Sequence, residues 1–121
     1  MKKILAVILV ALASASAAYS MELKDYNVLY RMNENSTFKA LVRYLNAGDE
    51  QADQLKYIFD LTERKLNYAN KKESTIDAER ALYFNLGNVK YILSEDQYRK
   101  YLIILNVSRF SKDEDYIADN N

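Results

Sequence analysis

The amino-acid sequence predicts an all-α protein, a small antiparallel bundle of about four helices. Three observations support this fold class. The chain of 121 residues contains no proline and only two glycines, so the strongest helix breakers are nearly absent. Apolar residues recur at spacings of three and four, which is the period of an amphipathic helix. Helix-capping residues precede these stretches, and the short connections between them favour antiparallel neighbours.

Residues 1–17 are expected to be a secretory signal peptide. Lys2 and Lys3 precede an apolar run over residues 4–13, and Ala15-Ser16-Ala17 offers a cleavage site of the A-x-A type. The run is shorter than the ~20 residues that a membrane-spanning helix needs. The chain has no cysteine that could carry a lipoprotein anchor. These features predict a bacterial protein that is periplasmic or secreted, with no membrane insertion after cleavage.

Composition argues against several classes of function. The chain has no histidine and no cysteine, which excludes Ser–His–Asp and Cys–His catalysis and the usual zinc sites. Two carboxylate pairs, Asp60 with Glu63 and Asp77 with Glu79, fit the ordinary solvated surface of a helix. Loss of the signal peptide removes two lysines and leaves a net charge of −2, unlike a nucleic-acid-binding protein. We therefore expect no enzyme activity, cofactor, metal or nucleic-acid partner.

Residues 18–35 are expected to form an N-terminal arm or short helix. Alternate residues from Tyr26 to Met32 are apolar, as in a strand, whereas Leu23, Tyr26 and Tyr30 equally fit a helix. We favour a short helix or an irregular arm that packs on the bundle.

The helical domain is expected over residues 36–111 and begins with a helix over residues 37–47. Ser36 is its predicted N-cap, and Gly48 is its predicted left-handed C-terminal residue. Asp49 is then placed to cap the next helix. The apolar stripe of the first helix consists of Phe38, Leu41, Val42 and Leu45.

The second and third helices carry longer stripes. The second is predicted over residues 50–71, and the third begins at Ser74, with Asp77 in the capping-box position. Gly87 lies inside the third helix, where close approach of a neighbouring helix is favoured over a bend beside a site. The second stripe is Ala52, Leu55, Phe59, Thr62, Leu66 and Ala69; the third is Ala78, Ala81, Leu82, Leu86, Val89 and Leu93.

The fourth helix has the clearest start signal in the chain. Ser94 and Gln97 form a predicted capping box, in which each side chain accepts a hydrogen bond from the backbone of the other residue. The helix should run to about residue 110. Its apolar residues surround it almost completely, which predicts a central position or pairing on two sides. Residues 112–121 follow as an acidic tail that is expected to be flexible.

Tyrosine is the residue type in excess, with 11 in the chain. Its ring offers a large apolar face, and its hydroxyl requires water or a partner. One interpretation places the rings around the core with their hydroxyls outward. The other is an adaptable face that binds polypeptide. The candidate protein-binding face consists of Tyr57, Tyr68, Tyr83, Tyr91, Tyr98 and Tyr101.

The segment Leu93-Ser94-Glu95-Asp96-Gln97 resembles the L-T-x-x-Q motif of small helical periplasmic proteins of the Spy/CpxP kind, with Ser94 in place of threonine. The resemblance implies ATP-independent chaperoning or stress regulation, usually as a dimer with a concave, basic face. This chain departs from that pattern because its mature form is slightly acidic. With Tyr98-Arg99-Lys100-Tyr101 after the capping box, the chain also looks like small exported helical proteins of uncharacterised function in Bacteroidetes.

The expected function is therefore binding of other proteins, in a chaperone-like or stress-regulatory role. The protein partner is unknown, and a homodimer is compatible with the sequence. The alternative is a structural or regulatory module that self-associates without chaperone activity.

Overall fold

The computed structural model describes residues 21–110 and confirms the all-α class. Within these residues a short 3-10 helix and five α-helices follow one another, and no strand is present. They are η1 (Leu23–Asn27), α2 (Val28–Met32), α3 (Asn35–Leu45), α4 (Asp49–Lys72), α5 (Thr75–Ile92) and α6 (Glu95–Phe110). The expected signal peptide over residues 1–17 and the acidic tail over residues 112–121 lie outside the described residues.

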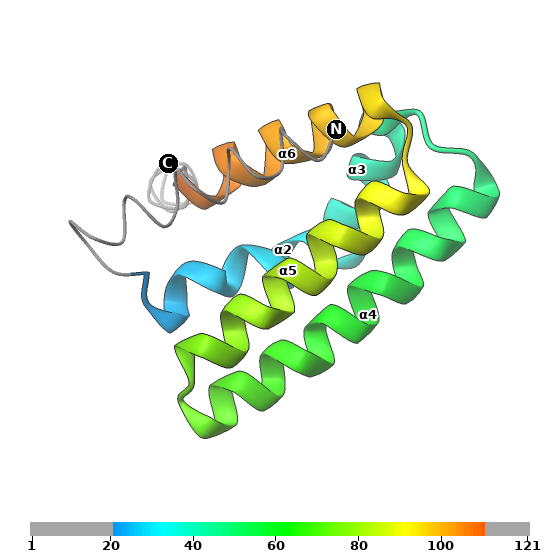
Figure 1. The fold of residues 1–121 in the computed structure, drawn as a ribbon. Coiled ribbons are helices and arrows are strands. Elements are labelled where there is room, and N and C mark those ends of the chain that lie inside the picture. Colours follow the sequence, from blue (N-terminus) through cyan, green and yellow to red (C-terminus); the bar gives the residue numbers. More distant parts are fainter. Residues whose placement is uncertain (1–20, 111–121) are drawn as a thin grey trace.

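The two longest helices, α4 and α5, form a hairpin and run in opposite directions along each other (Figure 1). A left-handed residue, Glu73, ends α4 with φ 53°, and the Ser74 N–H donates to the carbonyl of Ala69 across the turn. Ser74 then caps α5 as predicted, because its Oγ accepts from the Asp77 N–H at 3.1 Å. Local sequence signals therefore determine where the hairpin turns.

The apolar stripes of α4 and α5 face the remaining helices. All six predicted residues of the α5 stripe are buried, and so are those of the α4 stripe except Ala52, which is partly exposed. Segments η1, α2, α3 and α6 pack against this inner face of the hairpin (Figure 1). The opposite face of the hairpin carries no further helix from the described residues.

The N-terminal arm is helical and belongs to the core. Tyr26, Val28, Leu29 and Met32 are all buried against the hairpin. Val28 and Leu29 are neighbours in sequence and both point inward, which a strand with one buried face does not allow. The described part of this segment is therefore helical and packs on the bundle, which is the alternative favoured from the sequence over a strand.

The junction between α3 and α4 differs from the prediction at each capping position. Helix α3 begins at Asn35, so Ser36 lies inside its first turn. Asn46, with φ 55°, takes the left-handed position expected for Gly48, because asparagine tolerates this conformation. Gly48 instead is the N-cap of α4, where its N–H donates to Gln51 Oε1 at 3.0 Å. Asp49 is the first residue of α4.

Tertiary packing contradicts the expectation for Gly87 and excludes one of the two alternatives for α6, a central position. A methyl group added at Gly87 would meet no atom within 4 Å, so no neighbouring helix approaches this position closely. Helix α6 is not central, because Ile103 and Val107 are half-exposed on its outer side. Its inner side carries Tyr98 and Leu102, which are buried.

Candidate protein-binding groove

The six candidate tyrosines fall into two groups. Tyr98 and Tyr101 are 1% and 0% exposed, so they belong to the core and cannot form part of a surface. They lie on the inner side of α6, where the Tyr101 ring packs against Phe59 with centroids 6.0 Å apart. The other four candidates, Tyr57, Tyr68, Tyr83 and Tyr91, are exposed on α4 and α5.

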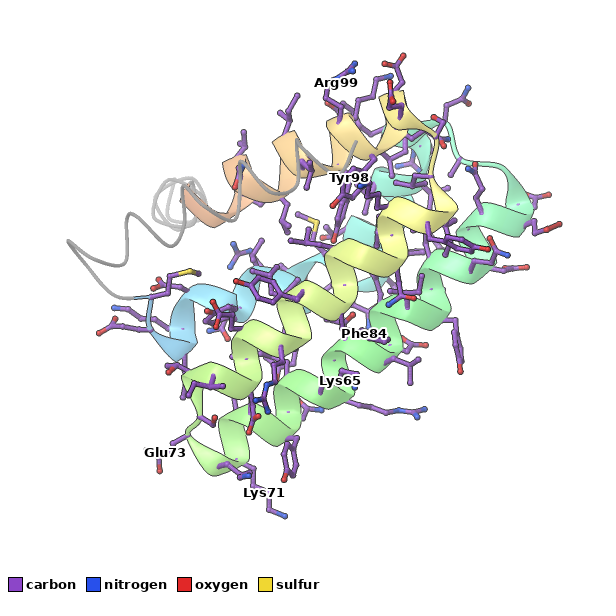
Figure 2. All side chains as sticks on the ribbon, viewed as in Figure 1. Lys65, Lys71, Glu73, Phe84, Tyr98 and Arg99 are labelled. Carbon is purple, nitrogen blue, oxygen red and sulfur yellow. The ribbon has the colours of Figure 1, made fainter. Side chains whose placement is uncertain are left out.

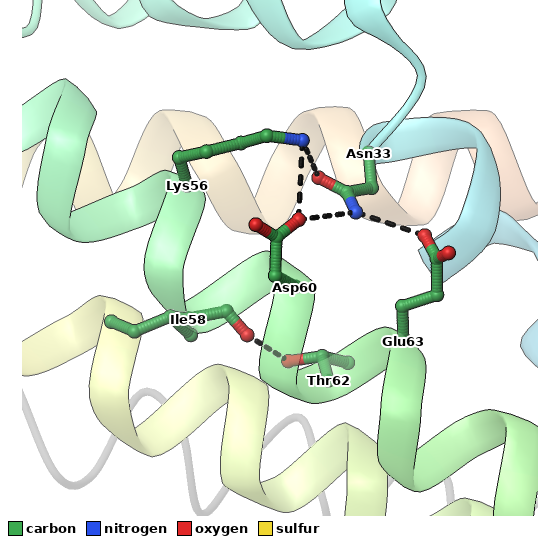
Figure 3. A network of polar contacts seen from close by, with 6 residues as sticks. All are labelled: Asn33, Lys56, Ile58, Asp60, Thr62 and Glu63. Carbon is green, nitrogen blue, oxygen red and sulfur yellow. Dashed lines mark hydrogen bonds and ion pairs between the residues drawn. The ribbon is translucent and has the colours of Figure 1, made fainter.

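The buried hydroxyl of Tyr101 belongs to a polar chain that crosses the core. Tyr101 Oη donates to Asn85 Oδ1, and Asn85 Nδ2 donates to Thr62 Oγ1 at 3.2 Å. Thr62 Oγ1 in turn donates to the carbonyl of Ile58 at 2.7 Å (Figure 3). Burial raises the pKa of the Tyr101 hydroxyl well above its ordinary value. Asn85 was not predicted as a functional or core residue, since its partners lie on other helices.

Tyr98 differs from Tyr101 in its hydrogen bonding. Its hydroxyl is buried but has no hydrogen-bond partner among the described residues. Burial raises the pKa of Tyr98 to about 12. A buried polar group without a partner costs about 1–3 kcal/mol of stability, whereas a hydrogen-bonded one contributes about 0.5–1.5 kcal/mol.

An apolar groove lies between α4 and α5 on the face of the hairpin away from the core. It has a volume of about 490 Å³, and its walls include Tyr57 and Leu61 from α4 and Phe84 and Tyr91 from α5. Tyr57 and Tyr91 are 67% and 90% exposed. The structure therefore places two of the predicted tyrosines on opposite walls of one apolar groove.

A second groove, also of about 490 Å³, continues along the same two helices and shares Leu61 with the first. It is lined by Tyr68 and by the basic side chains Arg64, Lys65 and Arg80. Figure 2 shows Lys65 of α4 and Phe84 of α5 between the two helices, and the Lys65 ammonium lies 4.8 Å from the Phe84 ring centroid. We call the two together the α4–α5 groove, with an apolar half and a basic half.

The basic half has an excess of positive charge. Its one lining carboxylate, Asp77, is already within 3.5 Å of Arg80 and 3.8 Å of Lys72. Arg64 and Lys65 have exposed side chains, and neither takes part in an ion pair found among the described residues. The sequence did not reveal this feature, because a net charge says nothing about where the charges gather.

Tyr83 does not line the α4–α5 groove. It is half-exposed on α5, and its hydroxyl donates to Glu79 Oε2 at 2.9 Å. Desolvation, and then the neighbouring Glu79 carboxylate, raises the pKa of Tyr83. Tyr83 therefore offers a matched control for the tyrosines of the groove.

Asp60 and Glu63, one of the two carboxylate pairs noted in the sequence, take part in a hydrogen-bonded contact between α2 and α4. Asn33 Nδ2 donates to Asp60 Oδ1 at 3.0 Å and to Glu63 Oε1 at 2.9 Å, and Lys56 Nζ reaches both Asn33 and Asp60 (Figure 3). The hydrogen bond from Asn33 lowers the pKa of Asp60, the opposite of what a general acid needs. Within residues 21–110, no three acidic side chains gather where they could hold a metal ion. The cluster fastens the end of α2 to α4.

The predicted capping box of α6 is present. The Ser94 N–H donates to Gln97 Oε1 at 2.9 Å, and the Gln97 N–H donates to Ser94 Oγ at 3.2 Å. Gln97 Nε2 also donates to the carbonyl of Leu45, at the end of α3, at 3.2 Å. The side-chain amides of Gln97 and Gln51 also donate hydrogen bonds to each other's oxygen, at 2.9 and 3.2 Å. Gln51 lies in the first turn of α4 and accepts from the N–H of its N-cap, Gly48. One side chain therefore caps its own helix and ties three helix ends together.

Comparisons with protein-family models, curated proteins and solved structures gave no match to this chain. In the part of the chain that the structure describes, no helix combines the length and the apolar character needed to cross a bilayer.

Proposed function

We propose that this protein is a small exported antiparallel bundle of about four helices that binds segments of other proteins in its α4–α5 groove. Removal of the signal peptide over residues 1–17 would release it into the periplasm or the medium. The observation that carries the proposal is the groove itself, in which the exposed rings of Tyr57 and Tyr91 flank an apolar floor.

The apolar half has the composition of a protein-binding surface. Contiguous exposed apolar side chains on a monomer are associated with interaction sites. Tyrosine suits such a site, because its rigid ring supplies a large contact area at a low cost in conformational entropy. The groove runs between two long helices, which is the shape that accepts an extended or helical segment.

The basic half supports a chaperone-like role. Proteins of the Spy/CpxP kind are expected to present a basic face, and the slightly acidic net charge argued against one here. Arg64, Lys65 and Arg80 gather positive charge at one end of the α4–α5 groove in spite of that net charge. A segment with both apolar and acidic residues therefore finds complementary groups along the groove.

The proposal is tested by suppression of aggregation of reduced insulin, followed by light scattering. We expect the protein to reduce scattering at a stoichiometric amount, and the double variant Tyr57→Ala/Tyr91→Ala to lose most of this effect. Tyr83→Ala is the matched control, because it removes a half-exposed tyrosine of α5 outside the groove. Equal suppression by the double variant, or none by the parent protein, would overturn the proposal.

Self-association remains a second candidate function, favoured by one observation. Ile103 and Val107 lie one turn apart on α6 and are 51% and 53% exposed. Such a pair on adjacent turns is the kind of stripe that buries itself against a second helix. Sedimentation velocity would show a dimer that Ile103→Asp abolishes; a strict monomer at high micromolar concentration would exclude this candidate.

A further inference from the structure

The outer face of α4 carries a second stripe of residues, here called the α4 outer stripe, at the spacing of a helix-packing seam. It begins at Glu50 and ends at Lys72, advances in steps of three and four residues, and has Leu61 at its midpoint; its other members are Gln54, Tyr57, Lys65 and Tyr68. Such a repeat suits packing against further helices, and none of the helices within residues 21–110 covers this face (Figure 1). We propose that a second copy of the chain packs on it, with α4 of one copy antiparallel to α4 of the other.

The α4 outer stripe is complementary to itself when it is reversed. In an antiparallel pair centred on Leu61, residues equally far before and after Leu61 lie opposite each other. Glu50 of each copy then faces Lys72 of the other copy, and Tyr57 faces Lys65. The first contact joins a carboxylate to an ammonium group, and the second places an ammonium group over an aromatic ring. Because the axis is two-fold, each contact is made twice.

The side chains at these positions have capacity for a further partner. Glu50 and Lys65 are exposed, and neither takes part in an ion pair found among the described residues. Lys72 is also exposed, and its contact with Asp77 at 3.8 Å is the longest ion pair within residues 21–110. The second copy therefore adds contacts without breaking a close ion pair in the first.

Helix α5 fits the same arrangement. The hydrogen bond from Asn85 to Thr62 sets these two residues side by side, so a two-fold axis at the midpoint of the α4 outer stripe crosses α5 just after Asn85. Tyr91 then lies about as far beyond the axis as Arg80 and Ala81 lie before it. The exposed ring of Tyr91 would therefore meet a small side chain and a guanidinium group of the second copy, and guanidinium groups stack well on aromatic rings.

Charge selects this arrangement over the other way of laying one hairpin on a second. A two-fold axis along the helices would place the basic half of the α4–α5 groove on the basic half of the second copy. Arg64, Lys65 and Arg80 would then face cations. The antiparallel arrangement instead lays each basic half on an apolar half with exposed tyrosine rings.

The second copy would occupy the groove in which the proposed function places client segments. A client then binds only to the fraction of the protein whose groove is free, so its apparent affinity falls as the dimer forms. This consequence rests on the proposed function, whereas the dimer itself does not. The interface is also distinct from the stripe of Ile103 and Val107 on α6.

Thiol coupling tests the position of the two-fold axis. The chain has no cysteine, so a single introduced thiol reports on one position only. We expect Leu61→Cys to give a covalent dimer with a short bismaleimide, because the axis places the two thiols next to each other. Ile103→Cys, on the exposed side of α6, is the control. Coupling of Leu61→Cys that is no greater than that of Ile103→Cys would overturn the inference.

A charge exchange tests the register without changing the apolar part of the interface. Glu50→Lys and Lys72→Glu should each weaken the dimer about fivefold or more, because each places like charges opposite each other at both ends. The double variant Glu50→Lys/Lys72→Glu should restore the affinity of the parent to within about twofold. Lys39→Glu, at an exposed position of α3, should have no effect. Sedimentation velocity measures all four, and single variants without effect or a double variant without rescue would overturn the register.

Client assays distinguish the inference from the proposed function. The bismaleimide-coupled Leu61→Cys dimer keeps its thioether bonds under the conditions that reduce insulin. It should suppress insulin aggregation at least fivefold less than Leu61→Cys capped with a monofunctional maleimide. Equal suppression by the two would overturn the groove as the client site and leave the dimer standing. Suppression by a protein whose Leu61→Cys variant does not couple would overturn the dimer and leave the proposed function standing.

Discussion

The two faces of the α4–α5 hairpin use similar side chains for opposite purposes. On the inner face, Leu66 and Phe59 are buried beneath η1, α2, α3 and α6. On the outer face, Leu61, Phe84 and Tyr91 line a groove that no described helix covers. The difference teaches that helical periodicity alone does not separate core from surface. What decides is whether another part of the molecule lies over the stripe.

The largest expected effect is the difference in unfolding free energy between alanine substitutions on the two faces of the hairpin. Leu66→Ala on the inner face should lower the free energy of unfolding by about 2–5 kcal/mol, because it leaves a cavity in a fully buried site. Tyr91→Ala on the outer face should change it by no more than about 0.5 kcal/mol. Urea unfolding followed by circular dichroism measures both. A cost above about 2 kcal/mol for Tyr91→Ala would show that the outer face is part of the core.

Alkaline titration is expected to test the burial of Tyr98, which lies on the inner side of α6 in the core. Burial raises the pKa of Tyr98 from 10.0 to about 12, whereas the unfolded chain titrates at the ordinary tyrosine value. The native state thus retains a proton that the unfolded state loses. The stability from this group is fully present below pH 10 and is lost as the pH rises towards 12. Unfolding midpoints across this range should fall steadily, and a constant midpoint up to pH 12 would contradict the burial of Tyr98.

The polar chain in the core predicts a smaller, specific effect. Tyr101→Phe removes the hydroxyl that donates to Asn85 Oδ1 and leaves that buried oxygen without a donor. Unfolding should become easier by about 1–3 kcal/mol. Tyr98→Phe is the matched substitution on the same helix, and it removes a hydroxyl that has no partner within residues 21–110. It should leave stability unchanged or raise it by about 1 kcal/mol. Equal losses for the two variants would refute the difference in hydrogen bonding.

The smallest expected effect concerns the outward side of α5. Gly87 is exposed in the middle of the helix, and an added methyl group meets no atom within 4 Å. Gly87→Ala should therefore raise the free energy of unfolding by about 0.5–1 kcal/mol, because alanine loses less backbone entropy in a helix. Thermal unfolding measures the gain. A decrease in melting temperature would mean that another surface approaches Gly87.

Much of the fold could be predicted because its signals are local. The stripe of α5 and the caps at Ser74 and Ser94 depend on residues three or four positions apart, and all of them are present. The end of α3 was placed two residues too late, because Asn46 and Gly48 both allow a chain reversal. Only the packing of α3 against its neighbours selects between them.

The candidate site was predicted less well, for a physical reason. A tyrosine in an amphipathic helix suits a core position and a surface position equally, because its ring is apolar and its hydroxyl is polar. Tyr57, Tyr68 and Tyr91 line the α4–α5 groove, Tyr83 lies outside it, and Tyr98 and Tyr101 are buried. The basic side chains of the groove were missed, since Arg64 and Arg80 come together only when α4 and α5 pair.

By itself, the sequence determined the helical class, most of the helix ends and the absence of histidine and cysteine chemistry, because each follows from composition or from neighbours along the chain. Only the tertiary structure decided which tyrosines are buried, which partner Asn85 finds and where positive charge gathers. Those outcomes depend on side chains from different helices, whose proximity no local pattern encodes. The groove is such an outcome, because neither α4 nor α5 alone contains it.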